Sequence, residues 1–484
     1  MSYLGLDLGT SGLRALLTDA AGAVLGESVQ GYGASHPRPG WSEQDPQHWI
    51  DALEAAVADL AATCPAFADL DAIAVAGHMH GATLLDRDGT VIRPCILWND
   101  TRAHREAARL DAMDDVRELS GNIVFPGFTA PKLDWLRTHE PGNFARVSKA
   151  VLPATYLNLY LTGEAVCDMS DASGTAWLDV GARAWSEPLL RAGHMTQEQM
   201  PRLVEGSAVA GHLRADLARR WGLRPGITVA GGAGDNAAAA CGIGALHDGQ
   251  GFVSLGTSGV VLVARDGFHP APGTALHSFC HAVPGRWYQM GVMLAATDCL
   301  NWLSRITGET PAGLTGALGP ELQAPGRLRF LPYLSGERTP HNDAGLRGGF
   351  HGLGIETDRR DLTRAVLEGV AFGLRDCADA LARTGARPAS LFVIGGGAAS
   401  THWVEMLATV LDTPLHRVAG GAFGVALGAA RLARVAATGA APETVMQPPR
   451  VSETIAPRAD LVDAFAEAHA AFRALALRDT GEVR

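Results

Sequence analysis

Short runs of apolar residues alternate along the chain with longer stretches in which apolar positions recur every three or four residues. Residues 3–8, 15–18 and 24–28 are short runs in close succession, and they predict a strand meander. The stretch from Pro46 to Ala62 has the helical period, and Asp45 immediately before it is expected to be the N-cap of that helix.

The same alternation continues beyond this first helix. Residues 72–76 form another strand-like run, and Asp88-Gly89 has the composition of a hairpin turn. Strands and helices in this order favour the α/β class with mixed strand directions. Residues 460–477 predict an amphipathic helix that closes the second half of the chain, with an apolar face made of Leu461, Phe465, Ala468, Phe472 and Leu475.

An internal repeat divides the chain. The pentapeptide Leu-Gly-Thr-Ser-Gly occurs at residues 8–12 and again at 255–259, each time between strand-like segments. A looser pair of small-residue segments, Gly231–Gly244 and Gly420–Ala430, lies near the end of each half. The repeat predicts two duplicated α/β domains, 1–245 and 246–484, with turn residues at the boundary.

Composition and charge mainly exclude classes of protein. The chain has 484 residues, 47% of them hydrophobic, and a net charge of −11 without a cluster of basic residues. These values exclude disorder and disfavour nucleic acid or an anionic membrane as the main partner, so a small molecule is preferred. With no signal peptide or membrane span expected and seven cysteines lacking CxxC spacing, the sequence predicts buried thiols in a cytoplasmic protein.

The two copies of the pentapeptide have the composition of phosphate-binding hairpins. Glycines let backbone N–H groups approach a ligand closely, and hydroxyl groups add donors. The first copy contributes Gly9, Thr10 and Ser11, and the second contributes Gly256, Thr257 and Ser258. Asp7, just before the first copy, is expected to hold a cation or its water shell. The alternative is two ordinary glycine-rich hairpins.

Other phosphate-binding motifs fit the sequence less well. A Walker A loop needs a lysine after a glycine, and neither of the only two lysines, Lys132 and Lys149, follows one. Gly232-x-Gly234-x-x-Ala237 matches a relaxed dinucleotide fingerprint, but the acidic residue expected after the next strand is missing. Phosphate is therefore expected to be held by backbone amides, hydroxyls and a metal ion.

Asp235 begins an alanine-rich segment directly after a glycine-rich strand end. It has two readings, as an N-cap and as a carboxylate that accepts a proton from a hydroxyl being phosphorylated, and one residue can fill both roles. The helix N-terminus is expected to hold its pKa low.

Polar residues at the ends of two other predicted strands suit a sugar. Met79 and His80 follow residues 72–76, with Met79 as a packing wall and His80 as a hydrogen-bonding group. His78 and His80 on an extended chain would share a face, so a metal pair is the alternative, although no third ligand follows at a suitable spacing. Trp98 and Asp100 end the next predicted strand, 95–98, and are expected in the same crevice; the alternative for Trp98 is a core aromatic.

A glycine triplet in the second half, Gly395–Gly397, follows a predicted strand at 391–394 and precedes Ser400. Glycines before a helix allow a flat adenine or ribose to lie against the backbone. Gly396, Gly397 and Ser400 are therefore candidates for nucleotide binding.

Taken in order, the motifs resemble the FGGY carbohydrate kinases of the actin/hexokinase/Hsp70 superfamily from residue 1 to about residue 440. The resemblance is carried by the two hairpins, the run Gly231–Asn236, the glycine triplet, and the segments 41–45, 79–81, 127–139, 169–172, 330–341 and 349–369. One position departs from the family pattern, because His78 stands where relatives carry Gln.

The resemblance implies two RNase H-like domains around an ATP cleft, and phosphorylation of D-xylulose at O5 by ATP with Mg²⁺. It further implies that Asp235 is the catalytic base, that Asp7 is the carboxylate at the magnesium end, and that Met79, His80, Asn236, Trp98 and Asp100 contact the sugar. A homodimer is among the assemblies that it allows.

Three other functions remain open from the sequence. One is another kinase of the same family, acting on ribulose, glycerol or an aldonate. The second is an actin- or Hsp70-like protein that uses ATP to drive assembly or client binding, which would need no sugar-binding wall. The third is a non-enzymatic sugar-binding regulator, which would need a partner surface that the charge of −11 does not indicate.

Overall fold

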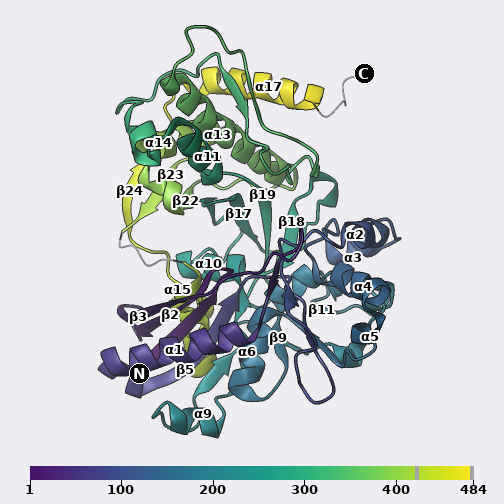
Figure 1. The fold of residues 1–484 in the computed structure, drawn as a ribbon. Coiled ribbons are helices and arrows are strands. Elements are labelled where there is room, and N and C mark those ends of the chain that lie inside the picture. The colour runs from purple at the N-terminus through teal and green to yellow at the C-terminus, as the bar shows by residue number, and fades with distance from the viewer. Residues whose placement is uncertain (420–423, 480–484) are drawn as a thin grey trace.

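The computed structural model describes residues 1–419 and 424–479 and consists of two α/β halves, one above the other in Figure 1. The central sheet of the N-terminal half has the strand order β13-β14-β5-β1-β2-β3, with β15 also paired to β5. Its strands are β1 (Ser2–Leu8), β2 (Gly12–Asp19), β3 (Val24–Gly31), β5 (Leu70–Gly77), β13 (Val209–His212), β14 (Thr228–Ala230) and β15 (Ala233–Gly234).

The central sheet of the C-terminal half has the order β18-β19-β17-β16-β22-β23-β24. Its strands are β16 (Gly251–Leu255), β17 (Gly259–Arg265), β18 (His277–Cys280), β19 (Trp287–Met293), β22 (Leu391–Ile394), β23 (Leu415–Val418) and β24 (Val451–Ile455). In each half an antiparallel hairpin forms the middle of the sheet, and two parallel strands continue it on one side. The duplication predicted from the pentapeptide is therefore present in the topology.

The predicted strand meander, the strand at 72–76 and the turn at Asp88-Gly89 are present. Gly89 has a φ of +78° and its N–H donates to the Asp86 carbonyl, which closes the turn. The predicted first helix is α1 (Gln47–Thr63), and its N-cap position is Pro46, one residue later than predicted. The Asp45 carboxylate still accepts the Gln47 N–H at 2.9 Å, a bond of the kind that a capping side chain makes.

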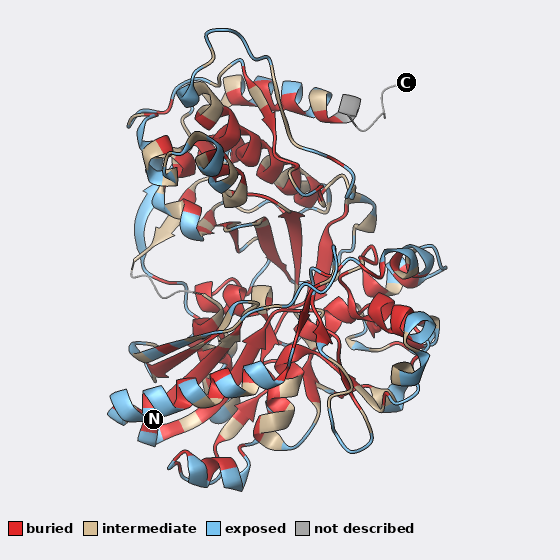
Figure 2. Cartoon of the chain, viewed as in Figure 1, coloured by how far each residue is buried: buried red, intermediate tan, exposed pale blue. Residues whose placement is uncertain are grey.

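Helices cover both faces of the sheets, and the buried layers follow the strands in Figure 2. The long insertion between β5 and β13 carries α2 (His104–Asp111), α3 (Val116–Ser120), α4 (Thr129–His139), α5 (Pro141–Phe144), α6 (Pro153–Thr162), α7 (Met169–Ala172) and α8 (Glu187–Ala192), followed later by α9 (Ala215–Arg220). Short strand pairs tie the insertion together: β4 (Glu43–Gln44) with β7 (Cys95–Ile96), β6 (Thr83–Leu85) with β8 (Lys149–Val151), β9 (Val166–Asp168) with β12 (Arg202–Val204), and β10 (Leu178–Asp179) with β11 (Ala184–Trp185).

The C-terminal half carries α11 (Thr297–Thr307), α12 (Pro311–Gly316), α13 (Arg359–Arg383), α14 (Thr401–Leu411), α16 (Pro442–Val445), α17 (Val462–Asp479) and the pair β20 (Arg329–Leu331) and β21 (Gly349–His351). The predicted amphipathic helix is α17. Its Phe465, Ala468 and Phe472 are buried in the core of this half, which confirms the prediction.

One helix of the C-terminal half packs on the other half. Helix α15 (Val425–Thr438) lies on β1 and β5 and crosses α10 (Asp235–Ile243), and in Figure 1 its yellow-green ribbon lies among the purple strands. The crossing is close: a Cβ on Gly428 would stand 1.8 Å from the Ala238 carbonyl oxygen. The two small-residue segments of the looser repeat thus contact each other; Gly420 to Phe423 lie outside the described residues.

All seven cysteine thiols are free and buried, as predicted. Among the described helices, none combines the length and apolar character that crossing a membrane requires.

Candidate active site

Two carboxylates lie at the carboxyl ends of the two strands that flank β5 in the N-terminal sheet. Asp7 on β1 and Ala233 on β15 are both paired in register with Ala76 of β5, and Asp235 follows β15 directly. Burial raises the pKa of Asp7 to about 7, and the nearby charge of Asp235 adds to the increase. The structure therefore brings the two acids predicted to be catalytic to one edge of the sheet.

The pKa of Asp235 differs from the expectation. Asp235 is the first residue of α10, with Gly234 as the N-cap, and its Oδ1 accepts the backbone N–H of Asn236 at 2.7 Å and the side-chain amide of Asn236 at 2.9 Å. These bonds favour the anion, yet burial outweighs them and raises the pKa to about 6. The prediction of a low pKa was wrong because desolvation is stronger here than the helix N-terminus.

The first glycine hairpin turns its carbonyl groups toward protein donors. The Tyr32 hydroxyl donates to the Gly9 carbonyl at 2.7 Å, and the Gln44 amide donates to the Thr10 carbonyl at 2.9 Å. In a trans peptide the N–H points opposite to the C=O, so the N–H groups of Thr10 and Ser11 point the other way. This geometry suits an anion.

The second hairpin has the same hydrogen-bonding pattern, in which its carbonyl groups face protein donors. The Gly256 carbonyl accepts the backbone N–H and the hydroxyl of Thr297, and the Thr257 carbonyl accepts the Ala296 N–H. The N–H groups of Thr257 and Ser258 consequently point away from α11. The repeated pentapeptide thus gives the same backbone arrangement in each half.

A cavity of about 790 Å³ lies next to the second hairpin and includes Gly396, Gly397 and Ser400 in its lining. The triplet forms a 3₁₀ turn before α14, and Ser400 caps that helix through the Trp403 N–H. Gly395 has a φ of +90°, and a Cβ there would stand 2.6 Å from the Leu255 carbonyl oxygen. Only glycine allows this close approach of the triplet to the hairpin.

Met79 and His80 follow β5 beside Asp235. Met79 packs on Gly234, where an added Cβ would meet its Cγ at 2.8 Å, and its sulfur accepts the Tyr288 hydroxyl at 3.9 Å. His80 has a φ of +72°, so it leaves the strand direction, and Lys132 holds it by donating to its carbonyl at 2.8 Å.

The His80 ring has one defined tautomer. Burial lowers its pKa to about 3, so the ring is neutral, and Nδ1 lies 2.7 Å from the Gly174 carbonyl, which can only accept. The proton is therefore on Nδ1, and Nε2 is an acceptor suited to a sugar hydroxyl. His78 does not share a face with His80. It is buried against Trp49, and neither of its ring nitrogens has a hydrogen-bond partner among the described residues.

Trp98 and Asp100 take different positions. The strand β7 ends at Ile96, two residues earlier than predicted, and Trp98 is 38% exposed, with its indole N–H donating to Thr10 Oγ1 at 3.0 Å. Trp98 is therefore not a core aromatic, and it contacts the first hairpin.

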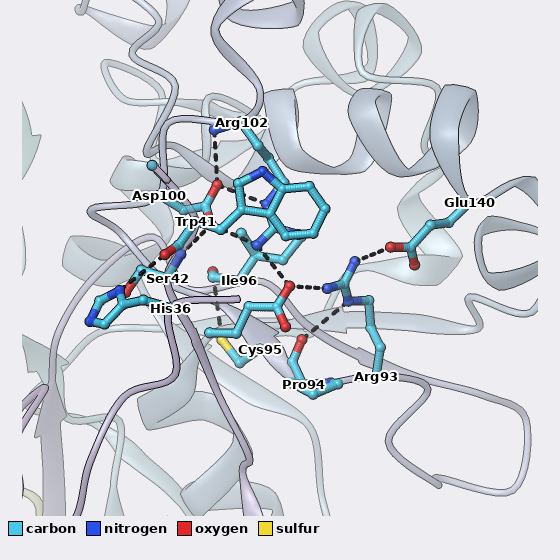
Figure 3. A network of polar contacts seen from close by, with 12 residues as sticks. His36, Trp41, Ser42, Arg93, Pro94, Cys95, Ile96, Asp100, Arg102 and Glu140 are labelled. Atoms are coloured by element: carbon cyan, nitrogen blue, oxygen red, sulfur yellow. Dashed lines mark hydrogen bonds and ion pairs between the residues drawn. The ribbon is translucent and has the colours of Figure 1, made fainter. Parts of the chain in front are cut away.

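The Asp100 carboxylate is engaged within the protein (Figure 3). It accepts two hydrogen bonds from the Arg102 side chain, at 2.8 and 2.7 Å, and the Ser42 N–H at 2.6 Å. The Arg102 guanidinium lies over the Trp41 ring at 3.6 Å and also pairs with Glu43 at 2.7 Å. Asp100 thus holds the loop that carries Trp98, and a direct contact with a sugar stays an untested prediction.

Several residues near the site were not predicted from the sequence. Asp171 on α7 is fully buried, both of its carboxylate oxygens lack a hydrogen-bond partner among the described residues, and its pKa is raised well above the ordinary value by burial and by the charges of Asp168 and Asp235. Tyr288, His277 and Arg338 come from the C-terminal half. The available signal was weak: these residues lie in or beside motifs, but nothing in their spacing places them together.

A duplicated RNase H-like fold, with a phosphate-type hairpin in each half and an acidic strand end beside one of them, defines a two-domain sugar kinase fold of the actin/hexokinase type. The model of the FGGY family of carbohydrate kinases, N-terminal domain, matches residues 2–242, and that of the C-terminal domain matches residues 251–437. The chain belongs to this family.

Relatives of known name are similar over nearly the whole chain. The xylulose kinase of Escherichia coli K12 is 46% identical over 438 residues, covering 90% of each chain. A solved structure described as a "xyloylose kinase" from Brucella ovis is 53% identical, with a TM-score of 0.96 and coverage of 98% of both chains. The xylulose kinase of Rhodospirillum rubrum is 31% identical, with a TM-score of 0.91 and 99% coverage of both.

Proposed function

We propose that this protein transfers the γ-phosphoryl group of ATP, bound with Mg²⁺, to O5 of D-xylulose and releases D-xylulose 5-phosphate and ADP. The observation that carries the proposal is the position of Asp235 directly after β15, where Met79 packs on the preceding Gly234 and the charge of Asp235 acts on Asp7, the residue just before the first hairpin. The names of the most similar relatives support D-xylulose as the acceptor.

Asp235 receives the proton of the O5 hydroxyl. Phosphoryl transfer develops little charge on the attacking oxygen until late, so the carboxylate acts first by orienting the hydroxyl and then by taking the proton. Asn236 fixes the carboxylate through two hydrogen bonds, and a pKa of about 6 leaves it mostly ionised at neutral pH. The hydroxyl oxygen then bonds to the γ-phosphorus while the bond to the leaving ADP oxygen breaks.

The two hairpins hold the phosphates by their backbone N–H groups, and the cavity beside Gly396 and Gly397 accommodates the base. Asp7 fits a hard divalent cation or its water shell, because it is a carboxylate whose pKa burial and Asp235 raise, and a positive charge would relieve both costs. Magnesium supplies neutralisation of the phosphate charge.

The halves have separate tasks in this proposal. Residues 1–245 provide the sugar site, the first hairpin and Asp235, and residues 246–484 provide most of the nucleotide site. Closing one half on the other would align O5 with the γ-phosphate and exclude water, which otherwise competes as the acceptor.

A substrate panel in a coupled ADP assay tests the proposal. With ATP and Mg²⁺ the panel contains D-xylulose, ribulose, glycerol and a no-sugar control. We expect D-xylulose to give the highest kcat/KM and to raise ATP turnover at least about tenfold over the control. Preference for another acceptor would assign a different kinase of this family, and turnover that does not depend on any sugar would favour an actin- or Hsp70-like activity.

A further inference from the structure

A partly buried arginine of the C-terminal half, Arg338, reaches the residues of the N-terminal half that are proposed to bind the sugar. Arg338 lies between two anchored neighbours: Glu337 Oε1 accepts the Leu294 and Arg338 N–H groups, and Thr339 exchanges hydrogen bonds with Val292 of β19. These bonds fix the Arg338 backbone at the end of β19, so the point from which its side chain extends is fixed.

The Arg338 side chain lies among aromatic rings that continue to His80. Its guanidinium is 4.6 Å from the centre of the Phe125 ring, and its Nη1 is 3.3 Å from His277 Nε2. His277 is 5.9 Å from Phe128, on which the His80 ring stacks at 4.7 Å. The positive charge of Arg338 contributes to the lowered pKa of His80 and of His277.

Arg338 has no carboxylate in an ion pair with it in the part of the chain that the structure describes. Other arginines that are buried or partly buried do: Arg102 pairs with Asp100 and Glu43, and Arg183 pairs with Glu205. Partial burial lowers the pKa of Arg338 to about 10, although Glu337 acts against the decrease. A guanidinium that is partly removed from water and has no counterion is poorly compensated, so its position needs another reason.

His277 adds an unsatisfied buried donor. Because Arg338 donates to His277 Nε2, the proton of the neutral ring is on Nδ1, and that atom is buried without a partner among the described residues. The His277 side chain is fully buried. The C-terminal half thus places one buried donor without an acceptor, His277 Nδ1, beside a guanidinium that has no ion-paired carboxylate.

The sugar-binding wall has an acidic and a basic end. Asp235 contributes to the raised pKa of Tyr288, whose hydroxyl contacts Met79, whereas Arg338 acts on His80 and His277.

A 2-ketopentose closes its five-membered ring through O5. Phosphorylation at O5 therefore requires the open chain, in which C2 is a carbonyl that can only accept hydrogen bonds. An arginine, which can only donate, matches this group.

We propose that Arg338 binds the carbonyl end of the open-chain ketose and makes the enzyme select ketoses over the corresponding polyols. The inference rests on the proposed function, because it places O5 at Asp235 and the C2 carbonyl at the opposite end. Arg338 is a substrate-binding residue contributed by the half that otherwise holds the nucleotide.

The test compares the wild type with Arg338→Met, which keeps the apolar stem, and Arg338→Lys, which keeps the charge. Arg347→Met is the matched control, since Arg347 is exposed in the same loop and donates only to nearby carbonyls. KM and kcat/KM are measured for D-xylulose and for xylitol and D-arabinitol, the polyols formed by reducing C2, together with KM for ATP and Tm.

For Arg338→Met we expect a KM for D-xylulose raised about 10- to 100-fold, the loss typical of a charge-assisted hydrogen bond. The ratio of kcat/KM for D-xylulose over the polyols falls by a similar factor, with KM for ATP and Tm unchanged or Tm raised. For Arg338→Lys we expect a KM for D-xylulose and a kcat/KM ratio between those of the wild type and Arg338→Met. For Arg347→Met we expect the wild-type values. The ratio does not depend on the fraction of folded enzyme, so it is informative even for a poorly folded variant.

An unchanged ratio, with or without a lower Tm, would overturn the inference and assign Arg338 a structural role. A raised KM for ATP alone would overturn it in favour of a phosphate contact. If the wild type does not use D-xylulose, the proposed function fails and this inference fails with it; if the wild type does but Arg338→Met is equally selective, only the inference fails.

Discussion

At the scale of single residues, the site and its surroundings contain four acids that the fold removes partly or wholly from water. Asp7, Asp168, Asp171 and Asp235 all have a raised pKa, with burial as the largest cause. The protein provides no lysine for the phosphates, since Lys132 is buried and donates to the His80 carbonyl. The negative charge of these acids is therefore balanced by the ligand or ion that binds beside them.

Asp235→Asn is expected to lower kcat about 10²- to 10⁴-fold while leaving nucleotide binding intact, because Asn can orient a hydroxyl but cannot take its proton. In the wild type, activity requires the ionised carboxylate, so kcat/KM should rise with pH through the Asp235 pKa of about 6. Steady-state kinetics against pH and nucleotide titration measure both. Near-wild-type kcat in the variant would remove Asp235 from the role of base.

Asp171→Asn is expected to raise Tm at pH 8. The folded-state pKa of Asp171 lies well above its ordinary value, so the group favours folding fully below the unfolded pKa near 4 and loses that contribution as pH rises. The neutral amide has no such dependence. The difference in Tm between variant and wild type should therefore shrink from pH 8 towards pH 4, as thermal unfolding in a pH series would show; a constant difference would contradict a buried, protonated Asp171.

At the scale of elements, the crossing of α10 and α15 joins the C-terminal half to the sheet of the N-terminal half. Glycines make the close contacts, as at Gly428 against the Ala238 carbonyl and at Gly5 of β1 against Ala426. Apolar helices of small residues can approach this closely only where no side chain intervenes.

Gly428→Val is expected to reduce the free energy of unfolding by about 2 kcal/mol or more, because the added atoms overlap backbone that cannot move without separating the helices. Gly142→Ala is the control, since a Cβ there meets open space. Chemical denaturation of both variants measures the effect. Equal stability of the two would show that the crossing can open without cost.

Most of the elements were predictable from the sequence, because the patterns that specify them lie within each segment. The strand meander, α1 and α17 follow from the spacing of apolar residues, and the two hairpins from glycines that recur at equal positions. The N-cap of α1 and the end of β7 were misplaced because caps and strand ends depend on contacts such as the pairing of β7 with β4, which no local pattern encodes.

At the scale of the whole molecule, the two halves meet along the edge of β18 and β19. The Asn122 side chain exchanges two hydrogen bonds with the Ser278 backbone, each 3.0 Å long, and the Trp287 indole N–H donates to the Val180 carbonyl at 2.8 Å. With α15 as the second connection, the halves are joined at two places, and the residues of both that are proposed to bind the sugar lie near the first.

The candidate site was predictable only in part, because contacts between distant segments complete it. Asp7, Asp235, Met79 and His80 belong to the ends of neighbouring strands, so their motifs were enough to group them. Arg338, His277 and Tyr288 meet them across the contact between the halves, and the pKa of Asp235 depends on its burial in the folded protein. Tertiary contacts determine both which residues of the C-terminal half reach the site and the pKa of Asp235. A single sequence does not show which distant segments make these contacts.

The placing of the lysines has a practical consequence for handling the protein. Lys132 is enclosed between β5 and the insertion, and Lys149 on β8 donates to the carbonyls of Glu198 and Met200 while remaining partly exposed. A reagent that acylates amines therefore finds one accessible lysine, Lys149, besides the α-amine of Met1. A fluorophore attached to a lysine in this way would mark one position in the N-terminal half and leave both glycine hairpins unmodified.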